Sequence, residues 1–316
     1  MSSFLSDNID EALGCWKAGG LVAIPTETVY GLGAPVDRED LILKIFSYKE
    51  RPFYDPLIVH ISDKLMAKNY VETWDPLTEL LTEKFWPGPL TIVLKKTNLV
   101  SDMITSGLPT VGIRCPKNKQ TLDLINALGV GVAAPSANKF TKTSPTNKDH
   151  VLHSFKDDHL CILTSDEKTE VGIESTIISI ENELITLLRP GIITQIDIEE
   201  ALKGEKFQFS LGKTAFEEKA PTAPGQDPIH YRPTYKLELM EGKGQIIEKE
   251  GAEYVLLDKD PYITARELYL LMRDPLKKSF NRRVFVLPES RHQLNEKEKQ
   301  VWQSILNRLV KAGKWV

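Results

Sequence analysis

Five short polar clusters lie beside apolar runs typical of β-strands. YKERP (48–52) presents Lys49 and Arg51, whose cations could meet phosphate oxygens, and VGIRCP (111–116) places Arg114 inside an apolar run. IPTETVYGLG (24–33) carries Thr26, Thr28 and Tyr30 beside two glycines. The remaining clusters, VAAPSAN with SPT and GIEST, supply Ser136, Asn138, Ser144, Glu174 and Ser175. Because open α/β sheets bind ligands at the carboxyl ends of their strands, these clusters indicate where a ligand would bind.

Each cluster also has a purely structural interpretation. Lys49 and Arg51 could form the solvated end of a helix, and serines in small-residue segments are ordinary turn residues. Arg114 could face outward from a strand, or it could need an anionic partner, because a buried guanidinium without one is costly. Spacing alone therefore does not name a substrate.

Common catalytic and nucleotide-binding motifs are absent from the sequence. It has no GxxxxGK[ST] loop, strand-linked GxGxxG, HExxH or GxSxG. His150 and His153 could share a helix face, but the sequence offers no third ligand nearby. We expect no metal site made by protein side chains alone, and the three scattered residues Cys15, Cys115 and Cys161 favour buried free thiols.

Composition and charge limit the class of protein. The 316 residues include 44 acids and 40 bases, and the net charge of −4 argues against nucleic-acid binding through bulk electrostatics. Residues 243–316 hold 15 Lys/Arg and 10 Asp/Glu, a local charge of +5, so residues 1–242 carry −9. No apolar run approaches the ~20 residues that cross a bilayer, and the acidic start does not resemble a signal peptide. We expect a cytoplasmic protein.

Strand-like and helix-like patterns alternate over the first 200 residues. They predict an α/β domain at 1–204 with a twisted, mixed sheet and flanking helices. A proline-rich segment makes 205–245 a linker, and 246–316 reads as a β-α-β-α unit, too short for a full dinucleotide-binding fold. The expected strands are 21–26, 56–61, 90–95, 111–116, 131–138, 160–164, 175–180, 184–191, 252–258 and 282–290, and the expected helices 7–20, 38–51, 78–86, 264–274 and 297–313.

In order along the chain, these stretches resemble the YrdC-like threonylcarbamoyl-AMP synthases. The matching motifs are PTETVYGLG, KxRP with PLIVHI, WPGPLT, VGIRCP, APSAN, SPT, GIEST and RPG. The resemblance continues through APGQDPIHYRP into a small C-terminal domain, as in the two-domain form of the family. It implies a YrdC-like fold followed by a shortened Rossmann-like domain.

The resemblance also implies an activity, that of a nucleotidyltransferase. Such enzymes form threonylcarbamoyl-AMP and pyrophosphate from L-threonine, bicarbonate and ATP, with Mg²⁺ accompanying ATP. A tRNA threonylcarbamoyl transferase complex then uses the product to modify adenosine 37 of certain tRNAs. Since every reactant is anionic, positioning and charge neutralisation would promote the reaction.

The resemblance assigns roles to individual residues. Lys49 and Arg51 would be catalytic and face the triphosphate. Thr28, His60, Arg114, Ala134 and Ser175 would bind L-threonine. ATP would contact Arg51, Asp55, Thr110, Ser136, Asn138, Ser144, Arg189, His230 and Tyr231.

Two features depart from the family pattern. The family commonly has Asn where this chain has Asp55, and an acid near the triphosphate would repel it unless Mg²⁺ intervenes. Residues 226–229 lack the basic character usual before the His230-Tyr231 pair, although Arg232 follows directly. We hypothesise that this proline-stiffened linker is a lid over the nucleotide.

Two other functions stay open at this stage. One is a relative that forms a carbamoyl adenylate from carbamoyl phosphate. The other is a non-catalytic RNA-binding protein, with Lys277, Lys278, Arg282 and Arg283 as the basic surface. Direct tRNA binding and oligomeric state do not follow from the sequence.

Overall fold

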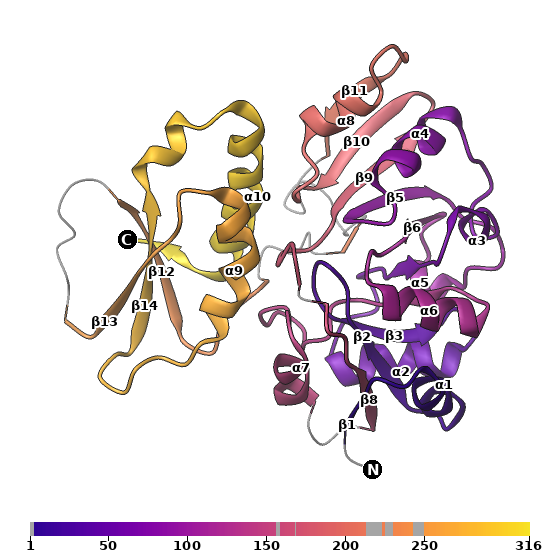
Figure 1. The fold of residues 1–316 in the computed structure, drawn as a ribbon, viewed down its shortest axis with the longest axis horizontal. Coiled ribbons are helices and arrows are strands. Elements are labelled where there is room, and N and C mark those ends of the chain that lie inside the picture. The colour runs from indigo at the N-terminus through magenta and orange to yellow at the C-terminus, as the bar shows by residue number, and fades with distance from the viewer. Residues whose placement is uncertain (1–2, 156–158, 168, 213–222, 225–229, 243–249) are drawn as a thin grey trace.

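The computed structural model describes residues 3–155, 159–167, 169–212, 223–224, 230–242 and 250–316. A large N-terminal part is built on an 11-stranded sheet, and a smaller C-terminal part on a four-stranded sheet (Figure 1). This confirms the expected α/β architecture with a second small α/β unit.

The large sheet is mixed, in the order β1-β8-β2-β3-β7-β4-β6-β5-β9-β10-β11. Strand pairs β4–β6 and β5–β9 are parallel, whereas β2–β3, β4–β7 and β9–β10 are antiparallel. The strands are β1 (Phe4–Ser6), β2 (Leu21–Ile24), β3 (Gly31–Pro35), β4 (Ile58–His60), β5 (Leu90–Lys95), β6 (Thr110–Arg114), β7 (Val132–Ala133), β8 (Leu160–Leu163), β9 (Thr176–Glu181), β10 (Leu184–Arg189) and β11 (Gln208–Leu211).

Side-chain caps begin most of the helices of this part. Asn8, Asp75 and Asn118 each accept a hydrogen bond from a first-turn backbone N–H, which satisfies a donor with no partner inside the helix. The helices are α1 (Ile9–Lys17), α2 (Glu39–Lys49), α3 (Lys64–Lys68), α4 (Pro76–Phe85), α5 (Asp102–Thr105), α6 (Lys119–Leu128), α7 (Lys148–Phe155) and α8 (Gln195–Ala201).

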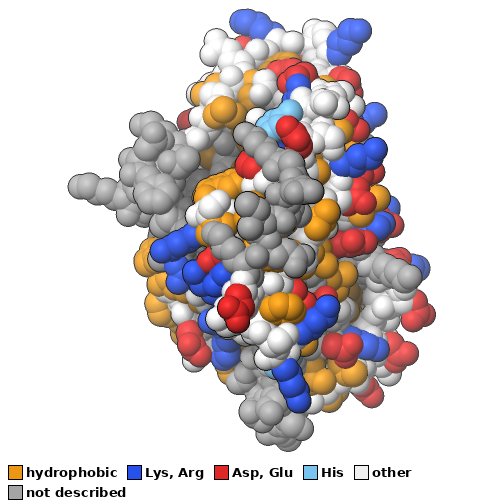
Figure 2. Space-filling model, turned by 90° about the vertical axis from the view of Figure 1, so that its left-hand side faces the viewer, with side chains coloured by type: hydrophobic (Ala, Val, Ile, Leu, Met, Phe, Trp, Pro, Cys, Tyr) orange, Lys and Arg blue, Asp and Glu red, His pale blue; other side chains and the backbone are white. Residues whose placement is uncertain are grey.

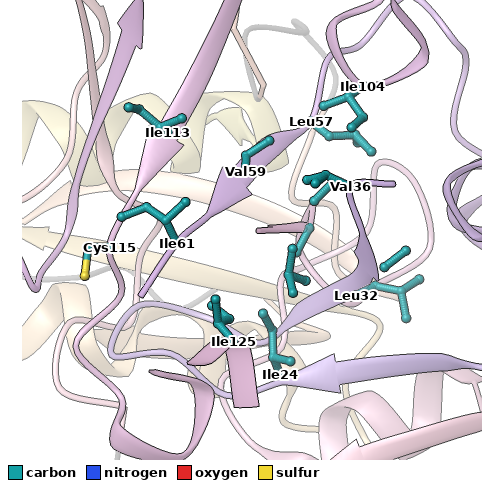
Figure 3. Packing of buried hydrophobic residues seen from close by; sticks show 14 of the residues in the cluster. Ile24, Leu32, Val36, Leu57, Val59, Ile61, Ile104, Ile113, Cys115 and Ile125 are labelled. Carbon is teal, nitrogen blue, oxygen red and sulfur yellow. The ribbon is translucent and has the colours of Figure 1, made fainter. Parts of the chain in front are cut away.

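The main apolar core lies between the large sheet and its helices. Figure 3 shows Val59 and Ile61 from β4 and its continuation packed with Ile113, Ile125 and Ile24. All five side chains are fully buried. The apolar runs that predicted strands therefore supply the buried side chains that stabilise the large sheet.

The small sheet is entirely parallel, in the order β13-β14-β12-β15. Its elements are β12 (Lys236–Gly242), β13 (Ala252–Leu256), α9 (Pro261–Arg273), β14 (Arg282–Pro288), the 3-10 helix η1 (Glu289–Gln293), α10 (Glu296–Ala312) and β15 (Lys314–Trp315). Helices α9 and α10 lie between this sheet and the large part (Figure 1). A parallel sheet with helical connections agrees with the expected shortened Rossmann-like unit.

Several local expectations differ from the structure. Only Val132–Ala133 of the expected strand 131–138 pairs as β7, because Pro135 has no N–H and the chain turns there. Strands β11 and β12 both lie within the range expected to be linker: β11 extends the large sheet, and β12 is central to the small one. These strands are short or bordered by charged residues, so their pairing was not visible as an apolar run.

Candidate functional site

A pocket opens between the large sheet and the linker. Its walls come from the β2–β3 loop, the ends of β4, β6 and β10, the segments 134–136 and 174–175, and the linker. It is lined by Thr26, Thr28, Val29, Gly31, Arg51, Ile58, His60, Arg114, Ala134, Pro135, Ser136, Glu174, Ser175, Arg189, Pro224, His230 and Tyr231. All five residues expected to bind threonine line this one pocket.

His60 and Arg114 end neighbouring parallel strands and pair in register. Arg114 Nη2 lies 2.7 Å from Glu27 Oε1, and its Nε donates to the backbone oxygen of Gly88 at 3.2 Å. Glu27 also accepts from the backbone N–H of Lys117 at 3.0 Å. This partner resolves the sequence ambiguity: Arg114 is buried, neutralised by Glu27 and held at the pocket wall.

His60 is buried in a neutral state. Burial, followed by the positive charge of Arg114, lowers its pKa to about 3. Its Nδ1 has no hydrogen-bond partner among the residues that the structure describes. The imidazole therefore lines the pocket without adding charge to it.

The β2–β3 loop is shaped by its own hydroxyls. Thr26 Oγ1 lies 2.8 Å from Thr28 Oγ1 and donates to the backbone oxygen of Val29 at 2.6 Å. At Gly31 an added Cβ would lie 3.1 Å from the Ala134 Cβ, so glycine lets the loop and the 134–136 segment approach each other closely. The loop thereby holds Thr28 against the pocket.

Lys49 and Arg51 leave the end of α2 in different directions. Glu50 takes a left-handed conformation with φ 55°, which ends the helix between them. Arg51 lines the pocket, pairs with Asp55 at 2.8 Å and donates to the backbone oxygens of Asp55 and Pro56. Lys49 does not line the pocket, although we expected it at an accessible cleft.

The Lys49 ammonium is instead held inside the protein. Its Nζ donates to the backbone oxygens of Ser136 at 2.6 Å and Asn138 at 2.5 Å, and the side chain is almost fully buried. Burial, with further lowering by the charge of Arg51, holds the lysine pKa well below its usual value. In this conformation Lys49 fixes the Ser136–Asn138 turn.

Only some of the remaining expected ATP contacts line the pocket. Ser136, Arg189, His230 and Tyr231 line the pocket with Arg51. Thr110 lies in an adjoining hollow that shares Ile58 and Pro224 with the pocket. Asp55 neutralises Arg51, Asn138 donates to the backbone oxygens of Lys139 and Lys142, and Ser144 donates to Glu174 at 2.6 Å.

Ser175 and Arg189 form one hydrogen-bonded unit. Arg189 Nη2 donates to Ser175 Oγ at 3.1 Å and its Nε to the Ser175 backbone oxygen, while Thr91 Oγ1 lies 2.7 Å from Ser175 Oγ. Arg189 Nη1 donates to the backbone oxygen of Pro224 in the linker at 3.1 Å. The linker thus touches the site at Pro224 and at His230-Tyr231, and Arg232 does not line it. Residues 226–229 lie outside the described part of the chain.

The sequence analysis gave no role to Glu27 or Arg308, and it named Glu174 only as a member of a polar cluster. Glu27 and Glu174 are buried carboxylates within recognised motifs, and each pairs with a buried arginine. Arg308, the partner of Glu174, sits far away in the sequence on α10. A glutamate inside an apolar or small-residue motif was the available signal for the first two, whereas nothing local marked Arg308.

Known proteins match this chain over both of its parts. Residues 15–191 match the Sua5, YciO and YrdC family, described as telomere recombination, and residues 193–313 match the C-terminal domain of threonylcarbamoyl-AMP synthase. The chain belongs to the threonylcarbamoyl-AMP synthase family. Its two matched regions together span the two parts of the fold.

Individual threonylcarbamoyl-AMP synthases resemble this member over most of their length. The Bacillus subtilis enzyme is 38% identical over 247 residues, covering 78% of this chain and 70% of its own. The Pyrococcus abyssi enzyme is 38% identical over 254 residues, covering 79% and 72%. A crystal structure of P. abyssi Sua5 complexed with L-threonine superposes with a TM-score of 0.81 at 29% identity and covers 99% of this chain and 98% of that one.

The cysteines, the helices and the clusters of metal-binding side chains were also compared with expectation. The three cysteines are free and buried, as expected. Over the described ranges, no helix has both the length and the apolar character needed to cross a membrane. No group of three or more His, Cys, Asp or Glu side chains within those ranges could hold a metal ion.

Buried neutral histidines make stability depend on pH. Burial lowers the pKa of His60 to about 3, of His230 to about 3 and of His150 to about 4. Below about pH 6.5 only the unfolded chain takes up these protons, so stability is full above that pH and lost as it falls toward 4. Each histidine should contribute a slope of up to about 1.4 kcal/mol per pH unit, measured by urea unfolding at several pH values.

Two histidine variants test this explanation. His150→Gln should reduce the pH dependence of the unfolding free energy by the amount that corresponds to the uptake of about one proton. His153→Gln, at an exposed position of the same helix α7, should leave the slope unchanged. An unchanged slope in His150→Gln would rule out the buried-histidine explanation.

Proposed function

We propose that this protein is an L-threonylcarbamoyladenylate synthase, which joins L-threonine, bicarbonate and ATP into threonylcarbamoyl-AMP and pyrophosphate. The carrying observation is that Arg51, Arg114 and Arg189 converge on one pocket with hydroxyls from Thr28, Ser136 and Ser175. Such a set of donors suits a ligand with several anionic groups. The family membership and the threonine bound by the P. abyssi relative support the choice of substrates.

Threonine would lie against the strand ends. The planar guanidinium of Arg114 would bind its carboxylate, and the neutral imidazole of His60 would lie beside the amino acid. Thr28, Ala134 and Ser175 would complete this end of the pocket. A buried, already oriented arginine needs little reorganisation when the ligand binds.

The chemical step needs no protein nucleophile. The threonine amine takes up bicarbonate with loss of water, and the new carboxylate oxygen attacks the α-phosphorus of ATP. The bond from that phosphorus to the bridging oxygen of pyrophosphate breaks, and pyrophosphate leaves with its charge. Arg51 and Arg189 would neutralise the phosphates, while Ser136 and the linker residues His230 and Tyr231 would hold the nucleotide.

Mg²⁺ would enter the site with ATP. The ion prefers oxygen ligands and commonly takes several from substrate phosphates, with few from protein. The arginines and hydroxyls around the pocket suit phosphate oxygens. When bound, Mg²⁺ supplies charge neutralisation at the triphosphate.

Partners and location follow from the proposed reaction. The product would pass to a tRNA threonylcarbamoyl transferase complex, in a transient encounter. ATP, bicarbonate and tRNA share the cytoplasm, where we place the protein. The family resemblance supports this function over a carbamoyl-adenylate-forming relative.

The described residues of the small part do not favour the RNA-binding alternative. Three of its four proposed RNA contacts are in ion pairs within this part: Arg283 and Lys277 with Glu253 at 2.6 and 3.9 Å, and Arg282 with Glu238 at 3.3 Å. Figure 2 shows the face formed by this part, on which Lys and Arg side chains lie among Asp and Glu side chains. Mixed charges attract the phosphate backbone weakly.

The proposed function is tested by pyrophosphate release. Purified protein with ATP, Mg²⁺ and bicarbonate should release pyrophosphate when L-threonine is added. Serine should support less release, because a methyl contact is worth about 1–3 kcal/mol. Release independent of the amino acid, or release that requires carbamoyl phosphate, would overturn the proposal.

A further inference from the structure

A buried carboxylate, that of Glu174, lines the pocket although ATP and bicarbonate, two of the substrates expected there, are anions. Its Oε2 lies 3.2 Å from Nε of Arg308, and its oxygens accept from the Tyr269 hydroxyl at 3.1 and 2.9 Å. Ser144 Oγ donates to Oε1 at 2.6 Å. Arg308 and Tyr269 belong to α10 and α9, so most of the partners of this pocket carboxylate come from the small part.

Hydrogen bonds to the surrounding backbone fix the Arg308 side chain beside Glu174. The side chain is fully buried, and its Nη1 donates to the backbone oxygens of Ser304 and Pro190. Its Nη2 donates to the backbone oxygen of Glu174 at 3.4 Å. The guanidinium therefore supports both the side chain and the backbone of Glu174.

The small part is pressed directly against this loop. At Gly172, with φ 78°, an added Cβ would lie 2.4 Å from the Cα and carbonyl oxygen of Arg266 on α9. Val171 and Ile173 of the same loop share an apolar cluster with Tyr269 and Trp302. This close docking sets the position of Arg308 relative to Glu174.

We propose that Arg308 is a positioning residue, which neutralises and orients Glu174 from the small part so that the pocket accepts ATP. The proposal rests on the proposed function. It gives the C-terminal part a role in substrate binding that is distinct from that of the linker. Without Arg308, a carboxylate would face the incoming phosphates in a poorly solvated pocket, where like charges repel strongly.

Variants that remove one or both charges distinguish neutralisation of Glu174 by Arg308 from a purely structural contact between the two parts. Arg308→Met should raise the KM for ATP about tenfold or more, because repulsion between like charges costs over 1.4 kcal/mol at such sites. Glu174→Gln in the same chain should recover most of that loss, since the uncompensated charge is gone. Urea unfolding of each variant checks that it folds.

The pH dependence gives a second signature. In the native chain burial opposes ionisation of Glu174, but Arg308 and Arg189 outweigh it and hold the pKa of the carboxyl below its usual value. In Arg308→Met the pKa should rise, so Glu174 is protonated at low pH and the KM for ATP increases as the pH is raised. Glu174→Gln should abolish this increase. The charged and titratable groups facing Glu174 are Arg308, Tyr269, Arg189, Tyr231 and His230.

A matched control lies on the same helix. Lys297 of α10 also pairs across the two parts, with Asp197 at 2.5 Å, and neither residue lines the pocket. Lys297→Met should leave the KM for ATP within about twofold of native, because the lysine is exposed and its pair lies outside the pocket.

Two outcomes would overturn the inference. The first is a double variant as impaired as Arg308→Met, and the second is an equal defect in Lys297→Met; both would reduce Arg308 to a docking contact. If the native chain itself releases no pyrophosphate with threonine, the proposed function fails instead. Equilibrium binding of a non-hydrolysable ATP analogue to each variant then still tests the role of Arg308.

Discussion

The Arg51→Met/Asp55→Asn double variant should release pyrophosphate about 10²–10³-fold more slowly than the native chain, because a preorganised cation at developing phosphate charge contributes that much. Arg51 lines the pocket and is oriented by the backbone oxygens of Asp55 and Pro56. Both partners of the buried pair are removed together because truncating only one leaves an uncompensated buried charge, which typically costs about 3–5 kcal/mol of stability. Turnover is measured as kcat, and folding by urea unfolding.

Asp55→Asn alone should strengthen ATP binding. The carboxylate lies 2.8 Å from the Arg51 guanidinium and shares its charge. An amide in the same place keeps the shape and leaves the full positive charge for the triphosphate, so the KM for ATP should fall several-fold. If Asp55→Asn weakens ATP binding and the double variant turns over normally, Arg51 does not act on the phosphates.

Lys49→Met should remove turnover and also destabilise the fold. The buried ammonium donates to the backbone oxygens of Ser136 and Asn138, and methionine removes both bonds. The Ser136 oxygen keeps the hydrogen bond from the Asn138 backbone N–H, whereas the Asn138 oxygen loses its donor. An unsatisfied buried acceptor costs about 1–3 kcal/mol, so the free energy of unfolding should fall by about that amount. The released turn would also displace Ser136 from the pocket.

Lys139→Met is the matched control for Lys49. Lys139 Nζ donates to the backbone oxygen of Tyr48 at 2.6 Å, so it also joins α2 to this turn, but the side chain is half-exposed. This variant should keep near-native turnover. Loss of turnover in Lys49→Met with unchanged stability would instead place the ammonium on the phosphates during the reaction.

Most of the large sheet was predictable from apolar runs. The runs at 21–26, 90–95 and 175–180 became β2, β5 and β9, because buried strands need near-continuous apolar residues. Strand β7 was overestimated because VAAPSAN is apolar at first but turns at Pro135. Strands β11 and β12 were missed because edge or charged positions carry a weak pattern.

The pocket was predictable as a set of motifs, and less so as a set of roles. The register that places His60 beside Arg114 follows from the pairing of β4 with β6. Lys49 and Arg51, two residues apart, differ in role because a left-handed residue ends the helix between them. Side-chain direction at such a turn depends on backbone angles that local sequence does not report.

The sequence by itself determined the α/β class, the motif order that marks the family, and the residue types that can bind anions. The tertiary structure decided which charged side chains of the pocket are neutralised by a neighbour and which can act on a ligand. Glu27, Asp55 and Arg308 each neutralise a pocket residue from another segment or turn, and electrostatic energy depends on distance and burial. Those quantities exist only once segments far apart in the chain, such as 174 and 308, have been folded together.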